Sequence, residues 1–140
     1  MPNFNDFKML SDRYLKSAEA LLATENFDSA YYLAGYSAEC LLKAIICKRI
    51  QQYEFPPKNV ERTHYTHILE RLIETAGLNK NLEFDRGKST ELEKSYKVLT
   101  DWDPQILRYD ASSVGKEKAK NYLDEIKNQK GFFIWLNKYL

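Results

Sequence analysis

The chain has 140 residues and a formal net charge of +1, so it is sized for one domain and carries no overall basic field for nucleic acid. Apolar residues make up 44% of it, which predicts a folded core and excludes a disordered chain. No segment reaches the roughly 20 apolar residues that a membrane span needs. Because the N-terminus also lacks an apolar signal core, we expect one cytoplasmic domain over residues 1–140 and no membrane contact.

The first half of the chain predicts two long helices. Apolar residues recur at three- and four-residue steps from Asn5 to Thr24. A second helix is expected to follow, with Asp28 as its N-cap and its end near Gln52. A stripe of mostly small residues lets another helix approach it closely and predicts a central position in the fold. The stripe consists of Ala30, Ala34, Ser37, Ala38 and Leu41.

The second half predicts three further helices separated by loops. Gly131 is expected to kink or loosen the last of them. The sequence as a whole therefore predicts an all-α fold, an up-and-down bundle of about five helices. The expected segments, in order, are a helix over 66–76, an irregular polar stretch over 78–88, a helix over 89–103, a non-helical segment over 105–114 and a helix over 116–139.

The central helix carries a charged pair, Glu39 and Lys43, in otherwise apolar surroundings. A carboxylate and an ammonium on such a helix must be solvated, pair with each other or meet a ligand. The first interpretation is an ordinary ion pair four residues apart, which contributes a few tenths of a kcal/mol. The second places Lys43 near an anionic group such as a phosphate.

The two histidines of the chain, His64 and His67, stand three residues apart. That spacing can seat a metal ion on a helix, but no third ligand follows in the required pattern, so no metal site is predicted. Arg62 and His67 also form an Arg-to-His spacing in which an Arg holds a phosphodiester and the His moves protons. A two-residue pattern of this kind often arises by chance.

A second candidate pair is Arg108 and Tyr109, in the non-helical segment before the last helix. An Arg beside an aromatic residue can clamp a phosphate or stack on a base, or it can hold the ends of neighbouring helices. The chain has no glycine-rich phosphate loop and no nucleophile elbow. No cofactor is predicted.

In their order and spacing, several segments together resemble the HEPN domain family of small helical domains. The resemblance spans most of the chain. It rests on Ala18–Leu22, on Phe27–Ala34 leading into Ser37–Ala44, on Thr66–Leu72, on Leu107–Asp110 and on Trp135–Leu136.

The resemblance implies a helical bundle that pairs into a homodimer. Family members work beside a small nucleotidyltransferase, several belong to toxin–antitoxin or phage-defence systems, and some bind nucleotides. Others are metal-independent ribonucleases, whose Arg-to-His motif corresponds here to the region of Arg108. No His follows His67 in this chain, so the catalytic His is missing there.

The resemblance therefore favours a non-catalytic module that binds a nucleotide or a partner such as a nucleotidyltransferase. The expected ligand-binding residues are Glu39, Lys43, His67, Arg108 and Tyr109. One alternative is a ribonuclease that acts on RNA through Arg62 and His67. Another is a purely structural helical subunit without a ligand.

Overall fold

A computed structural model describes residues 2–52, 66–104, 109 and 114–140. These residues contain helices and no strand, which confirms the all-α prediction for the described part of the chain. The labelled helices are α1 (Phe4–Ala23), α2 (Phe27–Gln52), α4 (Leu69–Thr75), α5 (Asn79–Arg86), α6 (Thr90–Thr100), α8 (Lys116–Lys127) and α9 (Phe132–Asn137).

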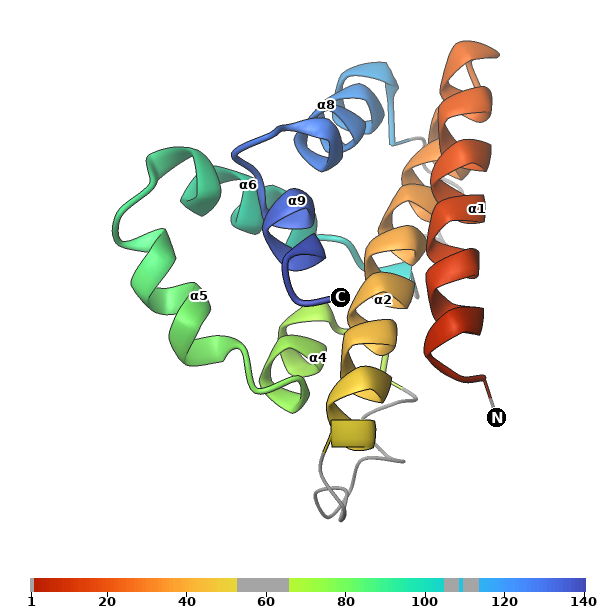
Figure 1. Cartoon of the computed structure of the whole chain (residues 1–140). Coiled ribbons are helices and arrows are strands. Elements are labelled where there is room, and N and C mark those ends of the chain that lie inside the picture. The colour runs from red at the N-terminus through yellow and green to blue at the C-terminus, as the bar shows by residue number, and fades with distance from the viewer. Residues whose placement is uncertain (1, 53–65, 105–108, 110–113) are drawn as a thin grey trace.

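Helices α1 and α2 form a long antiparallel pair (Figure 1). A capping box starts α1, because the Asn3 side chain accepts the Asp6 amide and the Asp6 carboxylate accepts the Asn3 amide. Midway along the pair, two buried serines bond reciprocally across the helices. Ser11 Oγ donates to the Ser37 carbonyl at 2.8 Å, and Ser37 Oγ donates to the Ser11 carbonyl at 2.7 Å. Small side chains on α2 are what bring the two backbones this close.

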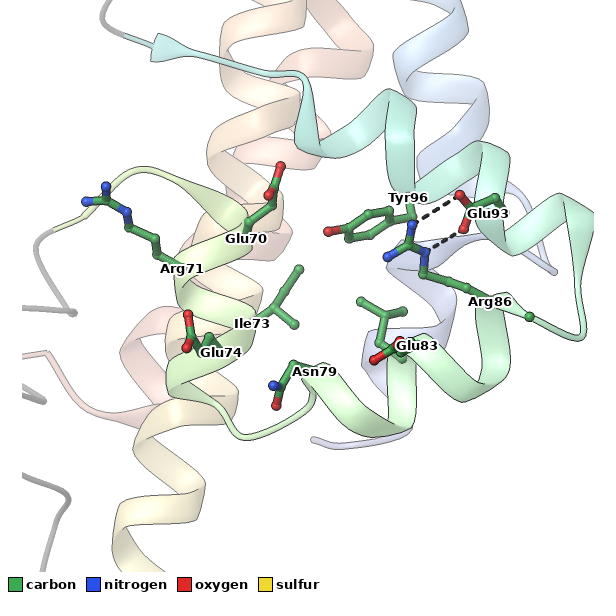
Figure 2. Close-up of a pocket in the computed structure, with 11 residues that line it drawn as sticks. Glu70, Arg71, Ile73, Glu74, Asn79, Glu83, Arg86, Glu93 and Tyr96 are labelled. Atoms are coloured by element: carbon green, nitrogen blue, oxygen red, sulfur yellow. Dashed lines mark hydrogen bonds and ion pairs between the residues drawn. The ribbon is translucent and has the colours of Figure 1, made fainter.

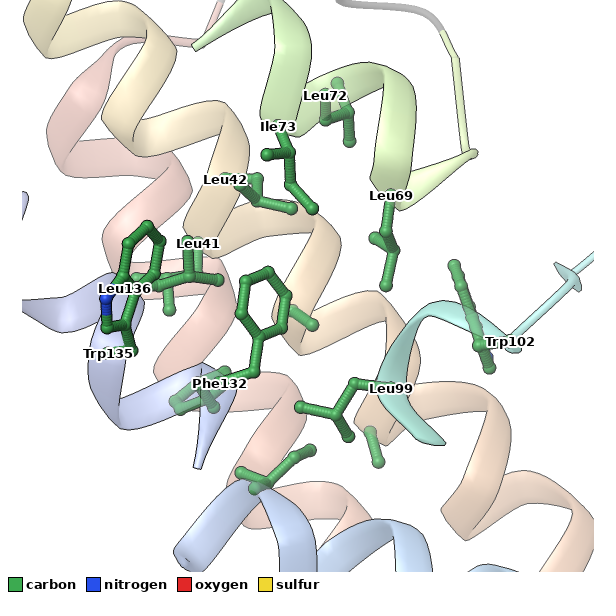
Figure 3. Packing of buried hydrophobic residues seen from close by; sticks show 14 of the residues in the cluster. Leu41, Leu42, Leu69, Leu72, Ile73, Leu99, Trp102, Phe132, Trp135 and Leu136 are labelled. Atoms are coloured by element: carbon green, nitrogen blue, oxygen red, sulfur yellow. The ribbon is translucent and has the colours of Figure 1, made fainter. Parts of the chain in front are cut away.

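Helix α2 is the centre of the core. Ala34, Ala38, Leu41 and Leu42 have no exposed surface, and α1, α4, α8 and α9 all pack against this helix. Figure 3 shows how side chains from the second half of the chain meet it. The labelled residues there are Leu41, Leu42, Leu69, Leu72, Ile73, Leu99, Trp102, Phe132, Trp135 and Leu136. The predicted central position of this helix is confirmed.

The start of α2 differs from the prediction. Asp28 lies inside the first turn instead of at the N-cap. Its Oδ1 accepts the backbone amide of Val114 at 2.5 Å, which ties the start of α2 to the segment before α8. The carboxylate therefore stabilises a contact between segments that are distant in the sequence.

The second half contains more helices than expected: seven helices are labelled where about five were predicted, and Pro104 and Tyr109 are helical outside them, although 105–114 was expected to be non-helical. The stretch 78–88, expected to be irregular, contains α5. Leu82 anchors α5 in the core, and Asp85 accepts the Trp135 indole N–H at 2.7 Å. Helix α4 begins at Leu69 rather than Thr66, whose hydroxyl accepts the Ile68 amide in a local turn.

The last predicted helix is broken into α8 and α9 at Gly131. A Cβ at that position would lie 2.8 Å from both Ser95 Oγ and the Glu125 carbonyl oxygen, too close for any side chain. The bare backbone lets Ser95 Oγ accept the Phe132 amide at 2.9 Å. This bond to α6 sets the first turn of α9 and turns the chain back onto the core.

Candidate functional site

Glu39 and Lys43 project from the same side of α2, one turn apart. Both are buried: Glu39 is 1% exposed and Lys43 is 9% exposed. Lys43 Nζ donates to Glu39 Oε2 at 3.4 Å. The pair is therefore not an ordinary solvated ion pair, and its two charges must be balanced by each other and by nearby groups.

The second partner of the carboxylate is His67, in the segment that leads into α4. Its Nδ1 lies 2.6 Å from Glu39 Oε1, and its side chain is 29% exposed. A carboxylate acceptor places the proton on Nδ1, so Nε2 carries the lone pair when the ring is neutral and a second N–H when it is charged. Glu39 thus fixes both the orientation and the tautomer of the imidazole.

Aromatic rings border this trio, which comprises Glu39, Lys43 and His67. The Tyr36 ring centroid lies 6.1 Å from that of His67 and 5.9 Å from that of Trp102, in an edge-to-face arrangement with Trp102. Trp102 is buried against Gly35, where a Cβ would overlap the indole ring. Because Gly35 has no side chain, the Trp102 indole can pack directly against α2 at this position, which is next to Tyr36 in the sequence.

Sequence reasoning proposed no binding role for Tyr36 and did not connect Gly35 with Trp102. The available signal was their position on α2. Tyr36 precedes Glu39 by three residues, so both lie on one side of a helix. A glycine inside a helical pattern indicates a packing or functional role at that position.

The structure brings together three of the five expected ligand-binding residues: Glu39, Lys43 and His67. Arg108 lies outside the described residues. The Tyr109 side chain is 87% exposed.

Two other sequence patterns cannot be placed. Arg62, of the Arg-to-His spacing, and His64, of the histidine pair, lie outside the described residues. Among the residues the structure does describe, no three His, Cys, Asp or Glu side chains are grouped to hold a metal ion.

Away from the trio, a pocket of about 800 Å³ opens between α4, α5 and α6 (Figure 2). Arg86 lies at the end of the pocket between α5 and α6. Its Nε and Nη2 donate to the two Glu93 oxygens at 2.5 and 3.1 Å, and its guanidinium carbon lies 3.8 Å from the Tyr96 ring centroid. The hydrogen bonds from Arg86, supported by Lys97, lower the pKa of Glu93 to about 2. This clamp links α5 to α6, and sequence analysis missed it because α5 was expected to be irregular.

Comparison with known proteins yields no assignment, because no protein-family model, curated protein or solved structure matches the chain. None of the described helices combines the length and apolar character of a bilayer-spanning segment. The candidate site is therefore interpreted from its own geometry.

Proposed function

We propose that the chain is a HEPN-like helical module that binds a nucleotide where Glu39, Lys43 and His67 meet. The observation that carries the proposal is the buried Glu39 carboxylate, which binds the Lys43 ammonium through one oxygen and the His67 imidazole through the other. Burying these groups is costly, and a core helix does not require them for packing. A ligand that uses the partly exposed imidazole gives the arrangement a function.

The trio has the chemistry to receive a phosphate. Its formal charge is zero with a neutral imidazole and +1 with a protonated one. When the imidazole is protonated, Glu39 accepts the hydrogen bond from Nδ1–H. The second N–H, on Nε2, can then donate to a phosphate oxygen. The half-buried Tyr36 ring, which contacts the rings of Tyr14, Tyr32, His67 and Trp102, gives the site an aromatic border beside which a nucleobase would lie. Arg108 and Tyr109 are included in the proposed site because of their position in the sequence.

Titration with ATP and GTP, followed by ¹H–¹⁵N NMR, tests this proposal. The chain has two tryptophans and therefore gives two indole N–H signals. Trp→Phe variants assign each signal to its residue. Binding at the trio is expected to shift the Trp102 signal in a saturable way. Lys43→Met keeps the aliphatic stem, and His67→Asn keeps a donor for Glu39 but removes Nε2. Both are expected to weaken binding at least tenfold.

Lys120→Met, at an exposed lysine of α8, is the matched control and should bind as the wild type does. Circular dichroism of each variant separates a loss of binding from a loss of fold. If neither nucleotide shifts any signal at millimolar concentration, or if folded His67→Asn binds as tightly as the wild type, the nucleotide proposal is wrong.

A metal-independent ribonuclease is the second candidate, and one observation favours it. A buried carboxylate that fixes Nδ1 and leaves Nε2 for proton transfer is a common arrangement for a histidine base. RNA incubated with the protein in EDTA should then be cleaved, and His67→Asn should abolish cleavage. An uncleaved substrate, or cleavage unaffected by His67→Asn, removes this candidate.

The resemblance also leads us to propose a homodimer and a small nucleotidyltransferase as partner, in a toxin–antitoxin or defence setting. Light scattering coupled to gel filtration measures the mass of the protein in solution. A monomer of 16.5 kDa would contradict the dimer. If this protein binds such an enzyme but does not bind a nucleotide, it is the purely structural subunit instead.

A further inference from the structure

We propose that a second cavity, separate from the trio, binds a phosphate monoester. This cavity has a volume of about 360 Å³ and lies where the end of α5, the start of α6, the α8–α9 turn and α9 meet. It shares no residue with the trio. The residues that matter here are Asp85, Lys88, Ser89, Lys130, Trp135 and Lys138.

The charge of the cavity wall is positive. Three lysines reach it from three separate segments: Lys88 after α5, Lys130 before α9 and Lys138 after α9. Asp85 is its one acidic lining residue, and that carboxylate already accepts the Trp135 indole N–H at 2.7 Å. The formal charge of the lining is therefore +2.

Neighbouring groups do little to neutralise the lysines. The ion pair of Lys130 with Glu91, at 3.8 Å, is exposed at both ends, and such pairs contribute little. Lys88 Nζ lies 4.2 Å from the centroid of the exposed Phe84 ring, a contact that leaves its full charge in place. In the described part of the chain, Lys138 makes no ion pair.

The polar and apolar groups of the wall fit an organic phosphate. Ser89 caps α6, accepting the Leu92 amide at 3.1 Å, so its hydroxyl proton stays available to a phosphate oxygen. The N-terminus of α6 adds a partial positive charge at the same place, and Glu91 and Glu93 in its first turn offset part of that charge. Leu92 and the Trp135 indole, both nearly buried, add a small apolar edge to the cavity. A phosphate dianion would relieve the repulsion among three ammonium groups, which a neutral ligand would not.

Titration with inorganic phosphate and with AMP tests the site, with the Trp135 indole N–H as reporter. The expected result is a saturable shift of the Trp135 signal in potassium chloride of constant ionic strength. The triple variant Lys88→Gln, Lys130→Gln and Lys138→Gln should lose that shift. A control triple at exposed lysines outside the cavity, Lys16→Gln, Lys116→Gln and Lys120→Gln, should keep it.

The two sites fail independently. A Trp135 shift that survives in His67→Asn but not in the cavity triple supports this site even if the trio binds nothing. If the Trp135 signal does not move at a phosphate concentration on the order of 10 mM, the dissociation constant is too weak for a specific site and the proposal is wrong. An equal loss in both lysine triples would also overturn it, because the effect would then be one of net charge.

Discussion

The imidazole of His67 and the carboxylate of Glu39 lie 2.6 Å apart although 28 residues separate them in the chain. One belongs to the central helix and the other to the segment that enters α4. Their contact links the segment before α4 to α2 through Nδ1 of the imidazole, so Nε2 is the ring nitrogen left for a ligand. Because the same carboxylate also holds Lys43, a change at Glu39 affects all three groups.

Glu39→Ala is expected to destabilise the protein by about 3–5 kcal/mol, because it leaves a buried ammonium without its partner. Glu39→Gln should cost less, since an amide oxygen can still accept from Lys43. Urea unfolding measures both losses. Glu83→Ala, at an exposed position of α5, is the control and should stay within about 0.5 kcal/mol of the wild type. A Glu39→Ala variant as stable as this control would show that the buried charges are balanced in another way.

Gly35→Ala is expected to cost about 1–3 kcal/mol, because the added Cβ would overlap the Trp102 indole and force it outward. The tryptophan fluorescence should shift to longer wavelength as Trp102 gains solvent. Gly87→Ala makes the same chemical change at the end of α5, where the Cβ would meet only ordinary contacts. Its stability should equal that of the wild type or rise by a few tenths of a kcal/mol. Equal effects of the two variants would disprove the close packing on Gly35.

The Arg86–Glu93 clamp predicts an acid-dependent loss of stability. The hydrogen bonds from Arg86 lower the pKa of Glu93 to about 2, below the ordinary value of 4.5. The unfolded chain therefore takes up the proton first, so the stabilisation is complete above pH 4.5 and is lost as the pH falls towards 2. Unfolding measured across this range should show a smaller pH dependence in Glu93→Gln than in the wild type. Identical slopes would mean that the clamp does not form in solution.

Cys40 is expected to resist alkylation. Burial, with a smaller effect of the Glu39 charge, raises the pKa of its thiol to about 12. Burial also raises the pKa of Cys47, which is less deeply placed. With iodoacetamide at pH 8, Cys47→Ala should react far more slowly than Cys40→Ala. Comparable rates in the two folded variants would contradict the burial of Cys40.

The raised pKa of Cys40 also has a consequence for stability at high pH. The thiol of the unfolded chain ionises first, near its ordinary pKa of 9. The protein should therefore lose stability as the pH rises from 9 towards 12. Cys40→Ala should reduce this loss, whereas Cys47→Ala should change it less.

The long helices could be predicted from the sequence, and so could the helical segments that contain α4 and α6, but α5 could not. Helix α1 begins and ends one residue before its predicted limits, because its apolar periodicity is continuous over 20 residues. Helix α5 has one buried apolar residue, Leu82, and depends on contacts made by Asp85 and Arg86 with distant segments. The break before α9 falls at Gly131, where the sequence predicted a kink, but the bond that sets the first turn of α9 comes from Ser95 on distant α6. Local patterns do not encode such contacts.

The candidate site divides along the same line. The spacing of Glu39 and Lys43 predicted that they could pair, and His67 and Arg108 were both expected beside them. His67 lies there, and Arg108 is outside the described residues. The aromatic border was not predictable, because Tyr36 and Trp102 meet only when α2 and the segment after α6 pack together. Their meeting depends on Gly35, whose role appears only once the indole is seen against it.

The central claim is that Glu39 orients His67 so that its second nitrogen receives a ligand. Long-range ¹H–¹⁵N NMR of the histidine rings, with and without ATP, tests this claim most directly. We predict a proton on Nδ1 of His67 in the free protein and a saturable shift of its Nε2 when ATP is added. A neutral ring that carries its proton on Nε2, or an Nε2 signal that does not respond to saturating ATP, would contradict the account.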